Sequence, residues 1–116
     1  MKAYAQALDL KDDPALIAEY KAYHRAVWPE VIASLRAIGI HTMRIYLTGT
    51  RLFMYFEAPD DFVAERDFQQ FAASGRGAEW DALMRRYQQR VPAASASPGE
   101  WWTPMELVFD LGAPST

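Results

Sequence analysis

Three large side chains follow one another at helical spacing in the segment EYKAYHRAVWPE, residues 19–30. Tyr20, His24 and Trp28 lie four residues apart, and side chains at this spacing share one face of a helix. Pro29 cannot donate a backbone hydrogen bond and disfavours helical torsions at Trp28, so the helix should kink or end just after His24. An imidazole near a helix C-terminus meets the negative end of the dipole, which favours its protonated form. His24 is therefore either a general acid or a packed core histidine.

Two further residues could assist such an acid. The Tyr20 hydroxyl, if free inside a cavity, could bind a substrate oxygen or orient the imidazole. Trp80, in the segment GAEWDALM, either fills the core or offers its face to the C–H surface of a carbohydrate. Asp81 beside it is expected to be a solvated helix residue unless that helix lines the pocket.

Several other chemistries have no support in the sequence. The chain has no cysteine, which excludes disulfides, thiol nucleophiles and cysteine metal sites. His24 and His41 are the two histidines, and they lack the short spacing of metal ligands. The SGRG segment at 74–77 lacks the preceding strand and the lysine of a phosphate loop, and no Gly-x-Ser-x-Gly elbow is present. We therefore expect no metal and no cofactor.

Size and composition favour one ordinary globular domain. The chain has 116 residues, 51% of them hydrophobic, which predicts a single domain over residues 1–116. The net charge of −3 comes with no basic stripe, so neither nucleic acid nor a membrane surface is an expected partner. No apolar run resembles a signal peptide or a membrane span, and a cytoplasmic location is expected.

The first half of the chain predicts a strand, a helical region and two strands. Residues 2–9 alternate with the period of a strand, and an aspartate at 12 or 13 precedes Pro14 as an N-cap. An apolar stripe spaced by threes and fours then runs to Gly39, which should end the helix. Residues 40–48 and 52–57 are strand-like, with a tight hairpin connection at 48–51.

The second half of the chain predicts a further helical region and a last strand. A helical zone is expected to begin at residues 59–61 and to run to about Tyr87, interrupted near 74–77. A loop should occupy Pro92 to Gly99, and residues 105–111 alternate as a last strand. The resulting βαββαβ order predicts an α+β, ferredoxin-like fold.

The sheet itself predicts a second subunit. Residues 52–57 are apolar on both faces, so helices should cover one face and a second copy the other, giving a dimeric α/β barrel. Trp101 and Trp102 are expected to form a dimer or cavity wall.

Four segments together resemble the L-rhamnose mutarotase family: EYKAYHRAVWPEV, LRAIGIHTMRIYL, EWDALM and PMELVFDL. The resemblance extends from Tyr4 to Leu111, and the Tyr-x-x-x-His-x-x-x-Trp-Pro-Glu segment is its most specific part. It implies a homodimeric enzyme that interconverts the α and β anomers of a pyranose.

The resemblance also implies roles for individual residues. The proton-donating histidine of the family falls on His24, and a substrate-binding tyrosine falls on Tyr20. The family's Trp-Trp sugar contact falls on Trp80 and Asp81, and a further substrate-binding tyrosine falls on Met43. Because two of these contacts are replaced, the same reaction on a different sugar is expected, and the ending EWWTPMELVFDL resembles the L-fucose branch.

We therefore predict general acid–base ring opening of a 6-deoxy-L-hexose, L-fucose ahead of L-rhamnose, with the proton acceptor left open among Asp81, a tyrosine and water. Two alternatives remain at this point, since the fold alone does not decide function. One is a cofactor-free monooxygenase or small isomerase of the same fold, and the other is a non-enzymatic ligand-binding dimer.

Overall fold

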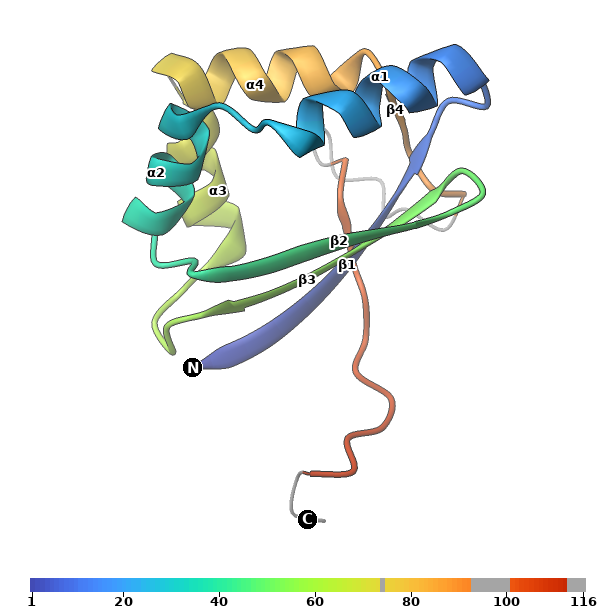
Figure 1. Cartoon of the computed structure of the whole chain (residues 1–116). Coiled ribbons are helices and arrows are strands. Elements are labelled where there is room, and N and C mark those ends of the chain that lie inside the picture. Colours follow the sequence, from blue (N-terminus) through green and yellow to red (C-terminus); the bar gives the residue numbers. More distant parts are fainter. Residues whose placement is uncertain (74, 93–100, 113–116) are drawn as a thin grey trace.

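The helices lie together over one face of an antiparallel sheet, as the computed structural model shows (Figure 1). The structure describes residues 1–73, 75–92 and 101–112. In chain order the elements are β1 (Lys2–Leu10), α1 (Pro14–Arg25), α2 (Pro29–Ala37), β2 (Thr42–Thr48), β3 (Arg51–Ala58), α3 (Ala64–Ala72), α4 (Gly75–Arg85), β4 (Gln88–Gln89) and β5 (Thr103–Pro104).

The sheet has the strand order of a ferredoxin-like domain. Its strands run β2-β3-β1-β4, and β5 also pairs with β1. Every pairing is antiparallel. β3 lies between β1 and β2, although α1 and α2 connect β1 to β2 along the chain. This is the split βαβ arrangement, so the predicted fold class is confirmed.

Two prolines and an aspartate set the limits of the first two helices. The Asp13 side chain accepts hydrogen bonds from the backbone N–H groups of Ala15 and Leu16, and Pro14 occupies the first helical position. Helix α1 ends at Arg25 and α2 begins at Pro29, with Trp28 in extended torsions between them. The predicted break after His24 is therefore confirmed, and it turns α2 away from the axis of α1 (Figure 1).

Glycine permits two of the sharp connections. The pairing of Thr48 with Arg51 leaves a two-residue hairpin loop in which Gly49 has φ +57°. Gly39, after α2, has φ +101°, and a Cβ there would lie 2.8 Å from the Pro59 ring. Any side chain at 39 would therefore be strained by both torsion and contact.

The core lies between the sheet and the helices. Along β3 the side chains alternate: Leu52, Met54, Phe56 and Ala58 are buried, whereas Phe53 lies half-buried on the opposite face. Leu8 and Leu10 of β1 and Val31 of α2 complete the most deeply buried set.

The second half differs from the sequence-based expectation in two places. Helix α3 begins at Ala64 and not at residues 59–61, and α4 ends at Arg85, before Tyr87. The last strand predicted at 105–111 is wrong for this chain, because pairing stops at Pro104. The predicted loop from Pro92 to Gly99 lies, from residue 93 onward, outside the described residues.

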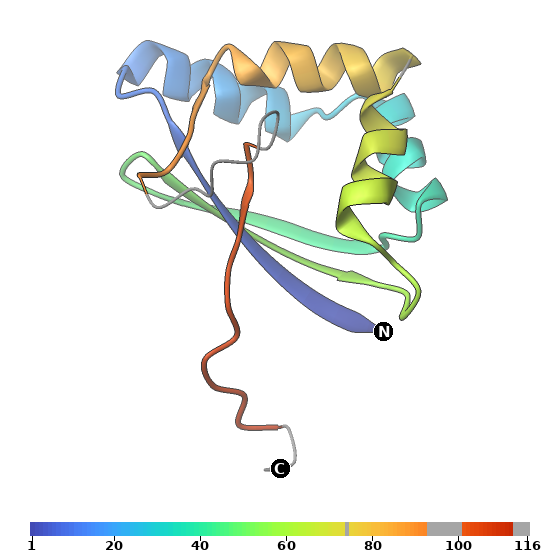
Figure 2. The ribbon, with the colours of Figure 1, turned by 180° about the vertical axis from the view of Figure 1, so that it is seen from behind.

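The segment after β5 extends away from the rest of the fold on the side of the sheet opposite the helices (Figures 1 and 2). The Met105 N–H donates to the Ala5 carbonyl at 2.8 Å, and the chain then leaves the sheet. An alternating sequence favours extended backbone, but a strand forms only beside a free strand edge. Four large apolar side chains in this segment are exposed by 67 to 90%: Leu107, Val108, Phe109 and Leu111.

Candidate active site

A cavity of about 370 Å³ opens between the helices and β2. It takes residues from α1, α2, α4, β2 and the connections between them, so the break at Pro29 and the turn at Gly39 both shape it. Its lining residues are His24, Val27, Ile32, Leu35, Arg36, Ile40, His41, Met43, Ile45 and Trp80.

The imidazole of His24 is held by the helix that carries it. Its Nδ1 lies 2.8 Å from the Tyr20 carbonyl oxygen, one turn earlier in α1. Because a carbonyl only accepts, Nδ1 carries the hydrogen and Nε2 is left as the nitrogen available to a ligand. The ring also packs on the Tyr20 ring, with centroids 4.2 Å apart, and edge-on against Trp80, at 5.4 Å. Its rotation is therefore constrained on two sides.

The protonation state of His24 differs from the one expected from its place in α1. Burial among aromatic rings lowers the pKa of His24 below its usual value of 6.5, although the hydrogen bond to the Tyr20 carbonyl acts in the opposite direction. The helix dipole had suggested a raised pKa. Loss of hydration from the charged ring outweighs that local effect, so the neutral imidazole predominates at neutral pH.

Tyr20 does not present its hydroxyl to the cavity. The residue is only 4% exposed, lies outside the lining, and its side chain is hydrogen-bonded to Gln88. Burial raises the pKa of Tyr20 to about 12. The expectation of a free hydroxyl is therefore wrong, and the contact of Tyr20 with the site is made by its ring and its carbonyl.

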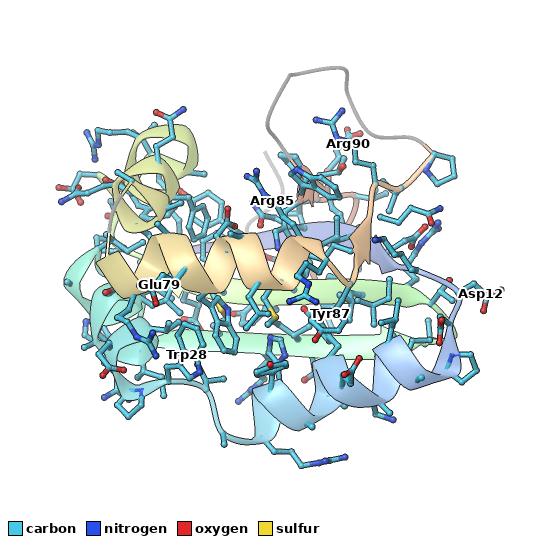
Figure 3. The ribbon with its side chains drawn as sticks, turned by 90° about the horizontal axis from the view of Figure 1, so that it is seen from above. Asp12, Trp28, Glu79, Arg85, Tyr87 and Arg90 are labelled. Carbon is cyan, nitrogen blue, oxygen red and sulfur yellow. The ribbon has the colours of Figure 1, made fainter. Side chains whose placement is uncertain are left out.

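Trp80 is the aromatic wall of the cavity and the centre of a ring cluster. Its ring lies 5.4 Å from His24, 5.1 Å from Trp28 and 6.2 Å from Tyr23. The Arg76 guanidinium stacks over Trp28 at 3.8 Å, which holds the outer side of the cluster. In the view onto the helices, Trp28 lies near the start of α4 and Tyr87 near its end (Figure 3).

The remaining predicted residues divide between the cavity and the surface. Met43 lines the cavity beside Ile45. Asp81 does not: its carboxylate forms an ion pair with Arg85 at 3.1 Å, and the side chain is 38% exposed. His24, Trp80 and Met43 thus meet at one site, whereas Asp81 lies outside it.

Sequence reasoning missed two polar residues of the cavity, Arg36 and His41. His41 had been considered only as a metal ligand. The signal that could have found it is alternation, because His41, Met43 and Ile45 are spaced by two residues and fall on one face of extended backbone. Arg36 lies in the last turn of α2, and nothing in its local sequence distinguishes it from a solvated arginine.

Within residues 1–73, 75–92 and 101–112, no three His, Asp or Glu side chains gather as metal ligands would. Over the same residues, no helix has both the length and the apolar character that crossing a bilayer requires.

The chain is thus a small ferredoxin-like α+β protein whose cavity places an oriented imidazole beside an aromatic wall. Comparison with known proteins identifies the family. The family model for L-rhamnose mutarotase matches residues 3–111, and the chain belongs to this family.

Individual relatives and one solved structure are similar to this chain over most of its length. An L-fucose mutarotase of Xanthomonas campestris pv. campestris is 39% identical over 113 residues, covering 96% of this chain and 89% of that protein. A UPF0734 protein of Dictyostelium discoideum is 52% identical over 112 residues, covering 95% and 90%. The crystal structure of an L-rhamnose mutarotase from Formosa agariphila superposes with a TM-score of 0.69 at 21% identity, covering 96% of this chain and 99% of the other, which supports the fold.

Proposed function

We propose that this protein is a mutarotase that interconverts the α and β pyranose anomers of a 6-deoxy-L-hexose. The observation that carries the proposal is the placement of the His24 imidazole, oriented by the Tyr20 carbonyl, in the same cavity as the Trp80 ring. The family supplies the reaction class, and the cavity supplies an acid–base group beside a flat apolar wall suited to the C–H face of a sugar.

L-Fucose is the sugar that we propose first. The L-fucose mutarotase relative matches almost the whole chain, whereas the family pattern for rhamnose has a tyrosine where this chain has Met43. L-Fucose and L-rhamnose differ in the configuration of ring hydroxyls, and a changed polar contact at the cavity wall discriminates between such substrates. With methionine in place of tyrosine at position 43, the cavity wall lacks one hydroxyl group.

The reaction needs only proton transfers. The ring oxygen gains a proton as the bond between it and the anomeric carbon breaks, and the anomeric hydroxyl loses one as the aldehyde forms. Rotation about the bond between the first two carbons and reclosure then give the other anomer, with the two protons returned. In the proposed mechanism, protonated His24 gives its proton to the ring oxygen from Nε2, and Trp80 holds the apolar face of the sugar.

At neutral pH most His24 rings are neutral, so only a fraction of the protein molecules carry the proton to be donated. That fraction can still donate its proton to the sugar. Reclosure returns the proton to the same nitrogen, so the group is regenerated in each exchange.

We further propose that the working form is a cytoplasmic homodimer. The exposed apolar side chains of residues 105–111 and the half-buried Phe53 and Tyr55 on the helix-free face support it. Among the residues that the structure describes, β2 pairs with β3 alone, so its other edge is open to the extended segment of a second copy. The absence of cysteine suits a reducing compartment.

Two experiments test these proposals. Freshly dissolved α-L-fucose, L-rhamnose and D-glucose are followed by optical rotation with and without the protein, and we expect faster equilibration that is greatest with L-fucose. Unchanged decay for every sugar would contradict the mutarotase. Phe109→Asp should shift the protein from dimer to monomer in analytical ultracentrifugation, whereas a dimer unaffected by this change would contradict the role of the C-terminal segment.

A further inference from the structure

The proposed reaction requires two groups, and the structure offers a candidate for the second. Ring opening needs one proton delivered to the ring oxygen and one taken from the anomeric hydroxyl. His24 accounts for the first. The group that takes the proton from the anomeric hydroxyl remains to be assigned, and its assignment rests on the proposed function.

The cavity contains few side chains able to accept a proton. Its titratable or charged lining groups, among the described residues, are His24, Arg36 and His41. The Arg36 guanidinium stays protonated and can only donate. Asp81 and Tyr20 lie outside the lining, each already bonded to another side chain. His41 is the lining residue that remains.

The backbone directs His41 at the cavity. Residue 41 lies directly before β2, and its side chain falls on the face shared with Met43 and Ile45, both of which also line the cavity. The turn at Gly39 fixes where this segment begins. His24 comes from α1 on the helical side, so the two imidazoles enter one cavity from separate layers of the fold.

The exposure of His41 also suits proton exchange with solvent. His24 is half-buried among rings, whereas His41 is exposed at the mouth of the cavity. The unprotonated nitrogen of an imidazole can accept a proton, and a ring that reaches solvent can pass that proton to water.

We propose that His41 is a second catalytic residue, which takes the proton of the anomeric hydroxyl while His24 protonates the ring oxygen. The bond from the anomeric carbon to the ring oxygen breaks, the carbonyl forms, and the charge moves from His24 to His41. In reclosure His41 returns its proton to the aldehyde oxygen as His24 recovers the proton of the attacking hydroxyl. Both residues end as they began.

The test compares His41→Gln with Lys21→Gln, a change to the same residue type at an exposed position of α1 that lies outside the cavity lining and away from the helix-free face of the sheet. Anomer exchange of L-fucose is measured by NMR over a series of sugar concentrations and pH values. We expect His41→Gln to lower kcat about 100-fold or more with little change in KM. Lys21→Gln should behave as the parent.

Further measurements separate the possible results. Equal thermal unfolding of the two variants shows that the loss is local, and added imidazole should restore part of the activity of His41→Ala. An unchanged kcat, or a change confined to KM, would overturn the role of His41 while leaving the mutarotase intact. A parent protein that does not accelerate exchange would overturn the proposed function, and this inference with it.

Discussion

Two clusters of aromatic rings occupy the space between the sheet and the helices, and they differ in what else they contain. The first, here named the closed cluster, packs β1 and β3 against the region of α3 and consists of Tyr4, Phe56, Phe62 and Phe68. The second, here named the open cluster, joins α1 to α4 and consists of Tyr20, Tyr23, His24, Trp28, Trp80 and Tyr87.

Ring packing is similar in both. Neighbouring centroids lie 4.9 to 5.7 Å apart in the closed cluster and 4.2 to 6.3 Å apart in the open one. What differs is that the open cluster includes an imidazole and borders a cavity, whereas Phe56 of the closed cluster is fully buried. Aromatic packing by itself stabilises the fold. It becomes a candidate active site where a titratable ring is held against open space.

The largest effect is expected in the closed cluster. Phe56→Ala should reduce the free energy of unfolding by about 3–5 kcal/mol, because it removes a fully buried ring and leaves a cavity. Urea unfolding measures this loss. Under conditions where the variant stays folded, anomer exchange per folded molecule should match the parent. A selective loss of exchange would mean that packing in the closed cluster affects the activity of the open cluster.

A smaller effect is expected for the wall of the open cluster. Trp80→Phe keeps an aromatic ring but reduces the flat surface, so we expect KM for L-fucose to rise about tenfold, equivalent to about 1.4 kcal/mol. Initial rates over a range of sugar concentrations check this. Met84→Leu, on the same helix and outside the cavity lining, is the control. If Trp80→Phe left KM at the parent value, Trp80 would be a core residue only.

The lowered pKa of His24 predicts how stability depends on pH. Its folded pKa lies below the unfolded value of about 6.5, so the unfolded chain binds more protons in the window between the two. The stability that depends on a neutral His24 ring is fully present above pH of about 6.5. It is lost as pH falls through the folded pKa of His24. His24→Asn should therefore lose less stability than the parent on acidification, as thermal unfolding at several pH values would show. Parallel curves would contradict the shift.

The smallest effect is expected at the rim of the open cluster. Arg76→Ala removes the guanidinium over Trp28 and should cost about 0.5–1 kcal/mol of unfolding free energy. Arg76→Lys keeps the charge and should lose less. If both variants unfolded as the parent does, the stacking would contribute nothing measurable.

Local signals explain what the sequence predicted correctly. Pro29 separates α1 from α2, Asp13 caps α1, and Gly39 permits the turn before β2. Each effect acts through backbone geometry within a few residues, so it is visible in one stretch of sequence. His24 and Trp80 were singled out by residue type and by the family pattern, and both line the cavity, while their roles stay predictions.

The errors arose where distant contacts decide the outcome. Tyr20 is closed off by Gln88, far along the chain, and Asp81 is turned outward by the rotation of α4. The pKa of His24 followed burial and not the nearby helix end. The C-terminal segment has the alternation of a strand, but pairing needs a neighbouring strand edge, and the described part of the chain places none beside it beyond Pro104.

The most direct test of the central claim, that the imidazole of the open cluster exchanges sugar anomers, is saturation-transfer NMR between the two anomeric protons of L-fucose. The parent and His24→Asn are compared at equal concentration and neutral pH. Asparagine can still donate a hydrogen bond toward the Tyr20 carbonyl, so the fold should persist. We predict transfer with the parent and exchange slower by about 10²–10⁴-fold with the variant. Equal transfer with both proteins would contradict the account.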